Sequence, residues 1–342
     1  MQRNRLRPEA YVAGIRAGDR GVLSRAITLI ESNLPADRSL AAEVVAQCMP
    51  FTGGAFRLGI TGSPGVGKST FIDSFGAFLA ASGLQVAVLA VDPSSQRTGG
   101  SILGDKTRME RLARHERAYI RPSPAGRSLG GVAANTRESL LLCEAAGFEV
   151  IIVETVGVGQ SETAVHAMVD FFLLLLLPHA GDELQGFKKG IVEMADGLLI
   201  NKADGDLLPK ARAAKATFSQ VVRLFPRESS GWSPPVMTCS AQENAGIAEV
   251  WEMLKGYREQ MQTASFWEQR RQQQAIQWME DTLRERLYES FFQHPEIRPL
   301  LRQFREEVAA GQRSPIRAAE MLLACWELEV GSRKTGDGRP LR

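Results

Sequence analysis

Between residues 56 and 240, short apolar runs alternate with longer stretches in which apolar residues recur at helical spacing. The runs are FRLGIT, VAVLAVD, AYIRP, VIIVET, DFFLLLLL, GLLINK and PVMTCS. Strands separated by helical segments are typical of βαβ units, which build a mainly parallel sheet. The most apolar run, FFLLLLLP, is far shorter than the roughly 20 residues of a membrane span and predicts a buried parallel strand. The pattern therefore predicts an α/β fold.

Helical periodicity dominates on both sides of this alternating region. Leu23, Ala26, Ile27 and Ile30 share one helical face near the start, so residues 1–50 are predicted to form an N-terminal helical segment, in which Asp37 or Ser39 caps a helix. The α/β domain is expected over residues 51–262 and a C-terminal helical arm over 263–330. The polar, glycine-containing tail, 331–342, is expected to be disordered.

One helix of the predicted arm carries a continuous apolar stripe. Ile276, Met279, Leu283 and Leu287 follow one another at helical spacing. Such a stripe either packs on its own domain or contacts a partner helix in a dimer, and the pattern alone leaves both interpretations open.

Charge and cysteine content indicate which classes of protein this chain can belong to and in which compartment it is expected. The formal net charge is +2, with both signs spread along the chain, which argues against a dedicated nucleic-acid surface. No segment reads as a secretory signal or a membrane span. The cysteines lie far apart in the sequence, which favours a reducing compartment and therefore the cytoplasm. They are Cys48, Cys143, Cys239 and Cys325.

A phosphate-binding motif follows the first apolar run. It reads Gly62, Ser63, Pro64, Gly65, Val66, Gly67, Lys68 and Ser69, and it matches G-x-x-x-x-G-K-[ST]. Its glycines allow successive backbone N–H groups to point at phosphate oxygens. Lys68 is expected to reach the β- and γ-phosphates and Ser69 to offer its hydroxyl to Mg²⁺. The helix that continues through Thr70 directs its positive end at the anion.

A second motif at a strand end predicts which base is bound. Asn201, Lys202 and Asp204 form N-K-x-D after the run GLLINK, which resembles the guanine-reading motif of GTPases. The Asp204 carboxylate can accept from both N1–H and the exocyclic amine of guanine, whereas adenine lacks this donor pair and would leave the carboxylate unpaired. Ser240 and Ala241 resemble the short motif whose backbone N–H meets guanine O6. GTP and GDP are therefore the predicted ligands.

Three acidic residues at or after strand ends are candidate ligands of a magnesium ion. They are Asp92, Asp105 and Glu154, although Asp105 could instead cap a helix. Glu154 begins E-T-V-G, the place where many GTPases have D-x-x-G. The N–H of Gly157 is then expected to sense the γ-phosphate within a mobile switch.

The predicted hydrolytic machinery departs from that of Ras-like proteins. Those proteins carry a water-orienting glutamine directly after the glycine of D-x-x-G, whereas this chain has Val158, and Gln160 comes two residues later. Intrinsic hydrolysis is therefore expected to be slow unless another group contributes. The segment GDELQGFKKG offers Lys188 as a second candidate catalytic residue beside Lys68, although it could also be a solvated basic turn.

Three longer runs resemble the MeaB/ArgK-type GTPases. They are VAVLAVDPSSQRTGGSILGDKTRM, VIIVETVGVGQSETAV and GDELQGFKKGI. The resemblance implies a P-loop G domain of the SIMIBI type and a homodimer joined through the C-terminal arm. It also implies a GTP-gated complex with adenosylcobalamin-dependent methylmalonyl-CoA mutase or a related acyl-CoA mutase, which the G protein protects and whose cofactor loading it gates.

The resemblance assigns phosphate and magnesium to Lys68 and Ser69, and a further switch to the segment around 182–188. The histidines lack the D-x-H-x-x-G context of cobalamin-binding proteins, so no direct cobalamin binding is expected. Two alternatives stay open. A nickel metallochaperone GTPase usually shows His-rich tracts, which this chain lacks. A kinase linked to amino-acid transport would not need N-K-x-D.

Overall fold

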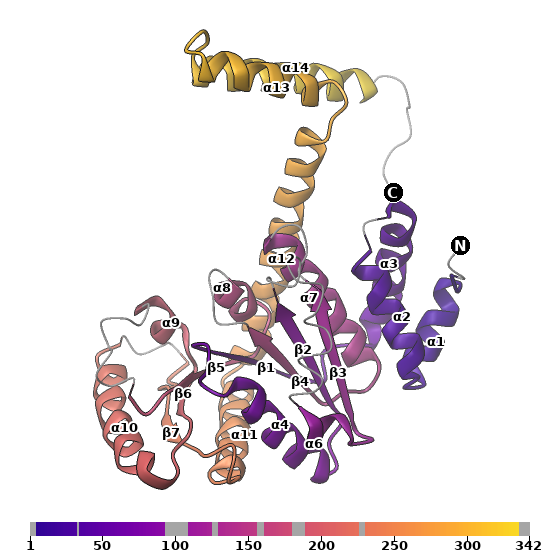
Figure 1. Ribbon diagram of the computed structural model, residues 1–342. Helices are drawn as coiled ribbons and strands as arrows, with labels where there is room; N and C mark the ends of the chain where they lie inside the picture. Colours follow the sequence, from indigo (N-terminus) through magenta and orange to yellow (C-terminus); the bar gives the residue numbers. More distant parts are fainter. Residues whose placement is uncertain are drawn as a thin grey trace. The chain divides into compact units, whose positions relative to one another are not determined.

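The computed structural model describes residues 5–32, 34–92, 109–124, 129–155, 161–179, 189–225 and 230–334. The chain divides into two compact units, Met1–Ala275 and Ile276–Arg342. Each unit is described by itself below, and Figure 1 labels their helices and strands.

The first unit is built on a seven-stranded sheet with the order β3-β2-β4-β1-β5-β6-β7. Every pair of neighbouring strands is parallel. The strands are β1 (Phe56–Gly62), β2 (Val86–Asp92), β3 (Ala118–Pro124), β4 (Val150–Thr155), β5 (Phe171–Leu176), β6 (Gly197–Ile200) and β7 (Val236–Thr238). Each strand falls within or overlaps a predicted apolar run, so the predicted α/β fold is confirmed.

Helices flank this sheet (Figure 1). They are α1 (Pro8–Arg16), α2 (Arg20–Ile30), α3 (Pro35–Cys48), α4 (Lys68–Ala81), α6 (Glu110–Ala113), α7 (Leu129–Ala145), α8 (Ser161–His166), α9 (Lys189–Met194), α10 (Leu208–Arg223) and α11 (Ile247–Thr263), with 3-10 turns η1 (Met49–Phe51) and η2 (Gly205–Leu207). α4 packs on β1, β2 and β3, and α11 packs on α4. α7 and α8 contact β4, and α10 contacts β6 and β7.

The main core lies between α4, α11 and the sheet. Phe56 and Ile60 of β1 meet Phe71 and Phe75 of α4 in one buried cluster. The rings of Phe71 and Phe75 stack with their centroids 5.4 Å apart. Because β1 and α4 are the two elements that flank the phosphate-loop motif, this packing fixes the position of both ends of the loop.

The N-terminal helices α1, α2 and α3 pack on one another and on α7. The predicted cap of α3 is wrong: the helix begins at Pro35, and its N-cap residue, Leu34, makes no side-chain cap hydrogen bond. Proline at the first helical position replaces the cap because its fixed φ suits the helix and it has no N–H to satisfy. Asp37 is instead fully buried and accepts hydrogen bonds from Arg5 and Ser32.

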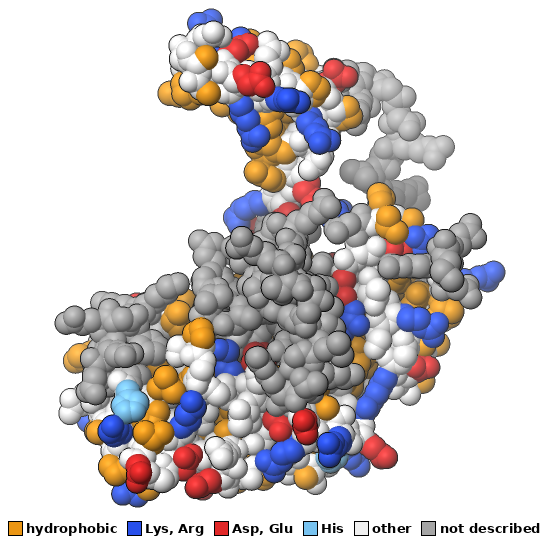
Figure 2. Space-filling view, viewed as in Figure 1, with side chains coloured by type: hydrophobic (Ala, Val, Ile, Leu, Met, Phe, Trp, Pro, Cys, Tyr) orange, Lys and Arg blue, Asp and Glu red, His pale blue; other side chains and the backbone are white. Residues whose placement is uncertain are grey.

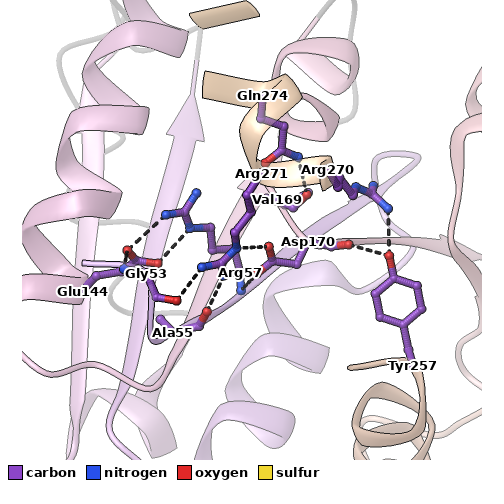
Figure 3. Close-up of polar contacts among 10 residues, drawn as sticks. All are labelled: Gly53, Ala55, Arg57, Glu144, Val169, Asp170, Tyr257, Arg270, Arg271 and Gln274. Carbon is purple, nitrogen blue, oxygen red and sulfur yellow. Dashed lines mark hydrogen bonds and ion pairs between the residues drawn. The ribbon is translucent and has the colours of Figure 1, made fainter. Parts of the chain in front are cut away.

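A buried network of charged side chains crosses the amino ends of the strands (Figure 3). We call it the amino-edge clamp; its members are Arg57, Glu144, Asp170, Asp196, Arg270 and Arg271. Arg271 donates twice to the carboxylate of Asp170, over 2.7 Å each. Arg57 donates twice to Glu144 over 2.8 and 3.0 Å, and Arg270 pairs likewise with Asp196. The clamp therefore fixes the start of α12 (Phe266–Phe292) to three strands and α7.

The second unit continues α12 and adds α13 (Ile297–Ala309) and α14 (Pro315–Lys334), which pack on each other. Its small core contains Ile297, Phe304, Ala318 and Leu322. α14 extends four residues into the tail expected to be disordered, and residues 335–342 lie outside the described part of the chain. Within the described residues, none of the helices is both long enough and apolar enough to cross a bilayer.

Candidate nucleotide-binding site

The phosphate-loop motif connects the end of β1 to the start of α4. Gly62 has φ of 153°, and a Cβ there would lie 2.6 Å from the carbonyl oxygen of Leu175. Gly67, the N-cap of α4, has φ of 93°, and a Cβ there would lie 2.7 Å from the side-chain nitrogen of Asn201. Both positions require glycine, because any side chain would meet an atom of a neighbouring element. The loop is thus held between β5 and the segment that carries Asn201.

Lys68 lies folded back on this loop. Its ammonium donates to the carbonyl oxygens of Gly62 over 2.7 Å and Ser63 over 3.4 Å, and the residue is buried. Burial lowers the pKa of Lys68, while the charges of Glu154 and Glu162 act in the opposite direction. Among the described residues, this ammonium donates to carbonyl oxygens beside the start of a helix, so it is suited to move onto a phosphate, which would provide full negative charges.

Ser69 and Glu154 meet at the same edge of the sheet. The Ser69 hydroxyl donates to Oε1 of Glu154 over 3.2 Å. β4 carries Glu154 and lies beside β1, so the carboxylate comes to the start of α4. Beside it, Thr155 donates to the hydroxyl of Thr61 over 2.9 Å and ties the ends of the two strands together.

Of the other two predicted magnesium-binding acids, the structure describes the backbone of Asp92 but not Asp105. The backbone of Asp92 ends β2, and β2 pairs with β4 so that Ala90 lies opposite Glu154. Asp92 and Glu154 therefore come to the same edge of neighbouring strands. Asp105, Gly157 and Lys188 lie outside the described residues.

The predicted base loop is bonded directly to the phosphate loop. The Asn201 side chain donates to the carbonyl of Val66 over 2.9 Å and accepts from the N–H of Ala241 over 3.2 Å. Lys202 is exposed and has φ of 58°, and its Cε comes near Gly67. Asn201 thus joins three segments that the sequence places far apart.

Asp204 is held by the serine of the second predicted motif. The Ser240 hydroxyl donates to Oδ2 of Asp204, and the N–H of Glu243 donates to the Ser240 oxygen over 3.1 Å. A carboxylate fixed in this way presents its other oxygen in a defined direction, as the recognition of a paired donor edge requires. Burial raises the pKa of the neighbouring Cys239 to about 12, with the Asp204 charge adding to the effect, so its thiol stays protonated.

Two polar residues near these loops were not singled out by the sequence. The Ser74 hydroxyl, on the second turn of α4, donates to the carbonyl of Ala241 over 2.6 Å. Glu162, on the first turn of α8, is only 3% exposed, and its charge acts on Lys68. No motif marks Ser74, and although Glu162 lies within the run VIIVETVGVGQSETAV, that pattern assigned it no role of its own.

Comparisons with known proteins show the family of the chain. Residues 23–296 match the family described as methylmalonyl Co-A mutase-associated GTPase MeaB. A probable GTPase of Mycobacterium tuberculosis strain H37Rv is 49% identical over 316 residues, covering 92% of this chain and 94% of the relative. The mitochondrial methylmalonic aciduria type A homolog of Mus musculus is 45% identical over 327 residues, covering 92% and 78%.

A solved structure shares the fold over nearly the whole chain. It is described as a LAO/AO transport system kinase, with a TM-score of 0.75 and 37% sequence identity, and the alignment covers 96% of this chain and all of that one. GTPase ArgK of Escherichia coli K12 is 46% identical over 289 residues, which are 84% of this chain and 87% of that protein. The chain belongs to the MeaB family of P-loop GTPases, and it binds and hydrolyses GTP.

Proposed function

We propose that this GTPase is a chaperone of an adenosylcobalamin-dependent methylmalonyl-CoA mutase or a related acyl-CoA mutase. It protects the mutase from inactivation and gates the loading of its cofactor. The observation that carries the proposal is the match, over residues 23–296, to a family described as mutase-associated. The name of the mouse relative, a methylmalonic aciduria type A homolog, supports the same assignment.

We assign the nucleotide to the loops described above. The phosphates bind residues 62–69 and the N–H of Thr70, and the γ-phosphate is sensed by Gly157. Guanine is read by Asn201, Lys202 and Asp204 together with the Ser240–Ala241 turn. The hydrogen bonds that join Asn201 to Val66 and to Ala241 support this assignment, because they hold the two halves of the site at a fixed separation.

The oxygen atoms near Ser69 suit a magnesium ion. The Ser69 hydroxyl and Glu154 carboxylate lie 3.2 Å apart, and both are the hard oxygen donors that Mg²⁺ prefers. We propose that these two residues, with Asp92 and Asp105, surround the ion. When bound, magnesium would neutralise charge on the β- and γ-phosphates. Lys188 remains a proposed catalytic residue of the segment around 182–188.

We further propose that the chain forms a homodimer through α12. Its stripe of Ile276, Met279, Leu283 and Leu287 is exposed by 53% to 57% per residue. Hydrophobic side chains are visible at the surface of this unit in Figure 2. A helical face of this kind in water is stabilised when a second copy covers it.

The dimer is tested by Leu283→Asp, which places a charge in the middle of the stripe. Analytical ultracentrifugation should show a monomer for this variant and a dimer for the wild type. Gln277→Asp puts the same charge on another face of α12 and should leave the dimer intact. A wild-type monomer, or a dimeric Leu283→Asp variant, contradicts this interface.

The chaperone role is tested with the purified mutase and its cofactor. The GTPase, loaded with a non-hydrolysable GTP analogue, should co-elute with the mutase in size-exclusion chromatography and lengthen the half-life of mutase activity during turnover. The Lys68→Ala variant, which lacks the proposed phosphate contact, should do neither in response to nucleotide. Absence of a nucleotide-dependent complex with any acyl-CoA mutase would contradict the chaperone role.

A kinase linked to amino-acid transport is the second candidate, because the solved relative carries that description. A kinase using ATP would not need the fixed carboxylate of Asp204. Competition binding decides the matter: a strong preference for GDP over ADP supports guanine reading, and equal affinity supports the kinase. A nickel metallochaperone is disfavoured by the scarcity of histidine, of which the chain has four.

The chaperone proposal also predicts which protein binds the cofactor. Cobalamin is expected to bind the mutase and not this chain, so absorbance titration of the isolated GTPase with adenosylcobalamin should show no saturable binding. A cytoplasmic location, inferred from the scattered cysteines, stays a prediction.

A further inference from the structure

Glu162 is a buried carboxylate with an oxygen that lacks a partner. The residue is 3% exposed, and its Oε2 is fully buried without a hydrogen bond to any part of the chain that the structure describes. Leaving a charged acceptor unpaired away from water is costly. A group of this kind in a folded protein calls for an explanation, and a donor supplied by a ligand is one.

The direction of α8 places Glu162 near the phosphate loop. The helix packs on β1 and β4, and a methyl of Val165 lies 3.1 Å from the position that a Cβ on Gly59 would take. At the end of α8, the His166 ring nitrogen lies 3.4 Å from Arg270 of the amino-edge clamp. α8 therefore points from the carboxyl edge of the sheet toward the amino edge. Its first turn lies at the carboxyl edge, where β1 ends at Gly62.

The electrostatics agree with this placement. The charges of Glu154 and Glu162 both act on the ammonium of Lys68, so both carboxylates lie within electrostatic reach of it. Glu154 is engaged by the hydroxyl of Ser69, whereas Oε2 of Glu162 has no hydrogen-bond partner among the residues that the structure describes. A triphosphate in the loop cannot pair with that oxygen directly, because both are negatively charged. A water molecule between them can, since it donates to the carboxylate and keeps a lone pair for phosphorus.

We propose that Glu162 is a catalytic residue of GTP hydrolysis, whose free carboxylate oxygen accepts a hydrogen bond from the water that attacks the γ-phosphorus. The inference rests on the proposed assignment of the phosphates to residues 62–69. Glu162 would supply the orienting group that Val158, at the position of the Ras glutamine, does not provide.

In the proposed hydrolysis, one bond to the γ-phosphorus forms and one breaks. The water oxygen forms a bond to the γ-phosphorus while the bond from that phosphorus to the β–γ bridging oxygen breaks. The electron pair of the broken bond leaves with GDP. The water proton passes to the Glu162 carboxylate, which then transfers it to the inorganic phosphate and returns to its starting state.

The test is single-turnover GTP hydrolysis by the full chain at saturating Mg²⁺. Glu162→Gln keeps the size of the side chain but removes its negative charge, and the rate constant should fall at least about tenfold. The Kd for GTP should stay within about threefold, because the water contact contributes little to ground-state binding. Glu162→Asp retains the carboxylate and should give an intermediate rate.

A matched control lies at the other edge of the sheet. Glu149→Gln makes the same change of charge at an exposed carboxylate that accepts only the backbone N–H of Gln85. Its hydrolysis rate should equal that of the wild type. Should Glu162→Gln fail to fold, Glu162→Asp decides the question: a rate at least about threefold below wild type supports the proposal, and a wild-type rate overturns it.

Two other results would overturn the proposal. A wild-type rate in folded Glu162→Gln would show that the carboxylate has no part in hydrolysis. A normal maximal rate with a raised Mg²⁺ requirement would show that it serves the metal instead. If Lys68→Ala leaves GTP affinity unchanged, the phosphate assignment itself fails, and that result is separate from any effect at Glu162.

Discussion

The two edges of the sheet differ in how completely their buried carboxylates are hydrogen-bonded. At the amino edge, the carboxylates of Glu144, Asp170 and Asp196 each face an arginine that donates to both carboxylate oxygens. At the carboxyl edge, Glu162 keeps a buried oxygen without a partner among the described residues. Carboxylates bonded at both oxygens fix an arrangement of elements, whereas an acceptor oxygen without a described donor leaves capacity to bind. The amino edge is therefore the structural edge of the sheet and the carboxyl edge the functional one.

The contrast extends to what each edge connects. The amino-edge clamp joins the start of α12 to β1, β5, β6 and α7 through carboxylates that are at most 4% exposed and arginines that are 14% to 24% exposed. Figure 3 shows the part of the clamp around Arg57, Asp170 and Arg271. The carboxyl edge instead joins loops to one another through single hydrogen bonds, such as that from Asn201 to Val66. These bonds hold the loops of the site in register with one another, whereas the clamp fixes the elements of the sheet itself.

The largest expected effect comes from breaking the clamp at Asp170. This carboxylate accepts two bonds from Arg271 and one from the backbone N–H of Arg57. Asp170→Ala removes the counter-ion of Arg271, which keeps its bonds to the carbonyls of Gly53 and Ala55, and leaves the backbone N–H of Arg57 without its acceptor. The free energy of unfolding should therefore fall by about 3–5 kcal/mol. Chemical denaturation measures the loss. A loss below about 1 kcal/mol would mean that water replaces the carboxylate and that the edge is not a rigid clamp.

The second-largest expected effect is a loss of nucleotide affinity, rather than of stability, when Asp204 is substituted. Asp204→Asn replaces one acceptor oxygen by an amide donor, so affinity for GDP should fall at least about tenfold, which is about 1.4 kcal/mol. The same variant should gain affinity for the xanthine nucleotide, whose C2 carbonyl accepts from an amide. Fluorescence titration measures both. A variant that keeps the guanine preference would remove Asp204 from base recognition.

The smallest expected effect is at Ser74, whose hydroxyl connects α4 to the Ala241 turn. Ser74→Ala removes the buried hydrogen bond to Ala241, worth about 1 kcal/mol, together with a longer one from Arg111, so the Kd for GDP should rise about three- to tenfold. Ser82→Ala is the matched control, because that hydroxyl bonds only to Phe78 within its own helix turn. Equal GDP affinity of the two variants would show that the turn is positioned without help from α4.

Sequence predicted the elements of both edges but not their contacts. The strands were predictable because buried parallel strands appear as apolar runs, and β5 has all six residues buried. The phosphate and base motifs were predictable because their chemistry imposes fixed spacings. The pairing of Arg271 with Asp170 was not, since the two residues are 101 positions apart and no local pattern links them.

The missed residues at the carboxyl edge have the same physical explanation. Ser74 belongs to no motif and makes its bond to Ala241 through tertiary structure. Glu162 lies within a motif-bearing run, but only the structure shows that its carboxylate is buried. The expected cap at Asp37 or Ser39 failed for a related reason: Asp37 is taken up by long-range bonds to Arg5 and Ser32. The role of a polar residue can therefore be predicted from sequence only where local geometry fixes its position.

The most direct test of the two-edge account compares two isosteric variants of the nucleotide-free protein. Glu144→Gln removes a charge that is paired with Arg57, and Glu162→Gln removes a charge that has an unpaired oxygen. The quantity measured is the free energy of unfolding. The account predicts opposite signs, with Glu144→Gln losing about 1–3 kcal/mol and Glu162→Gln gaining up to about 1 kcal/mol. A loss of stability in Glu162→Gln comparable to that in Glu144→Gln would contradict it, because Glu162 would then be a structural residue like those of the clamp.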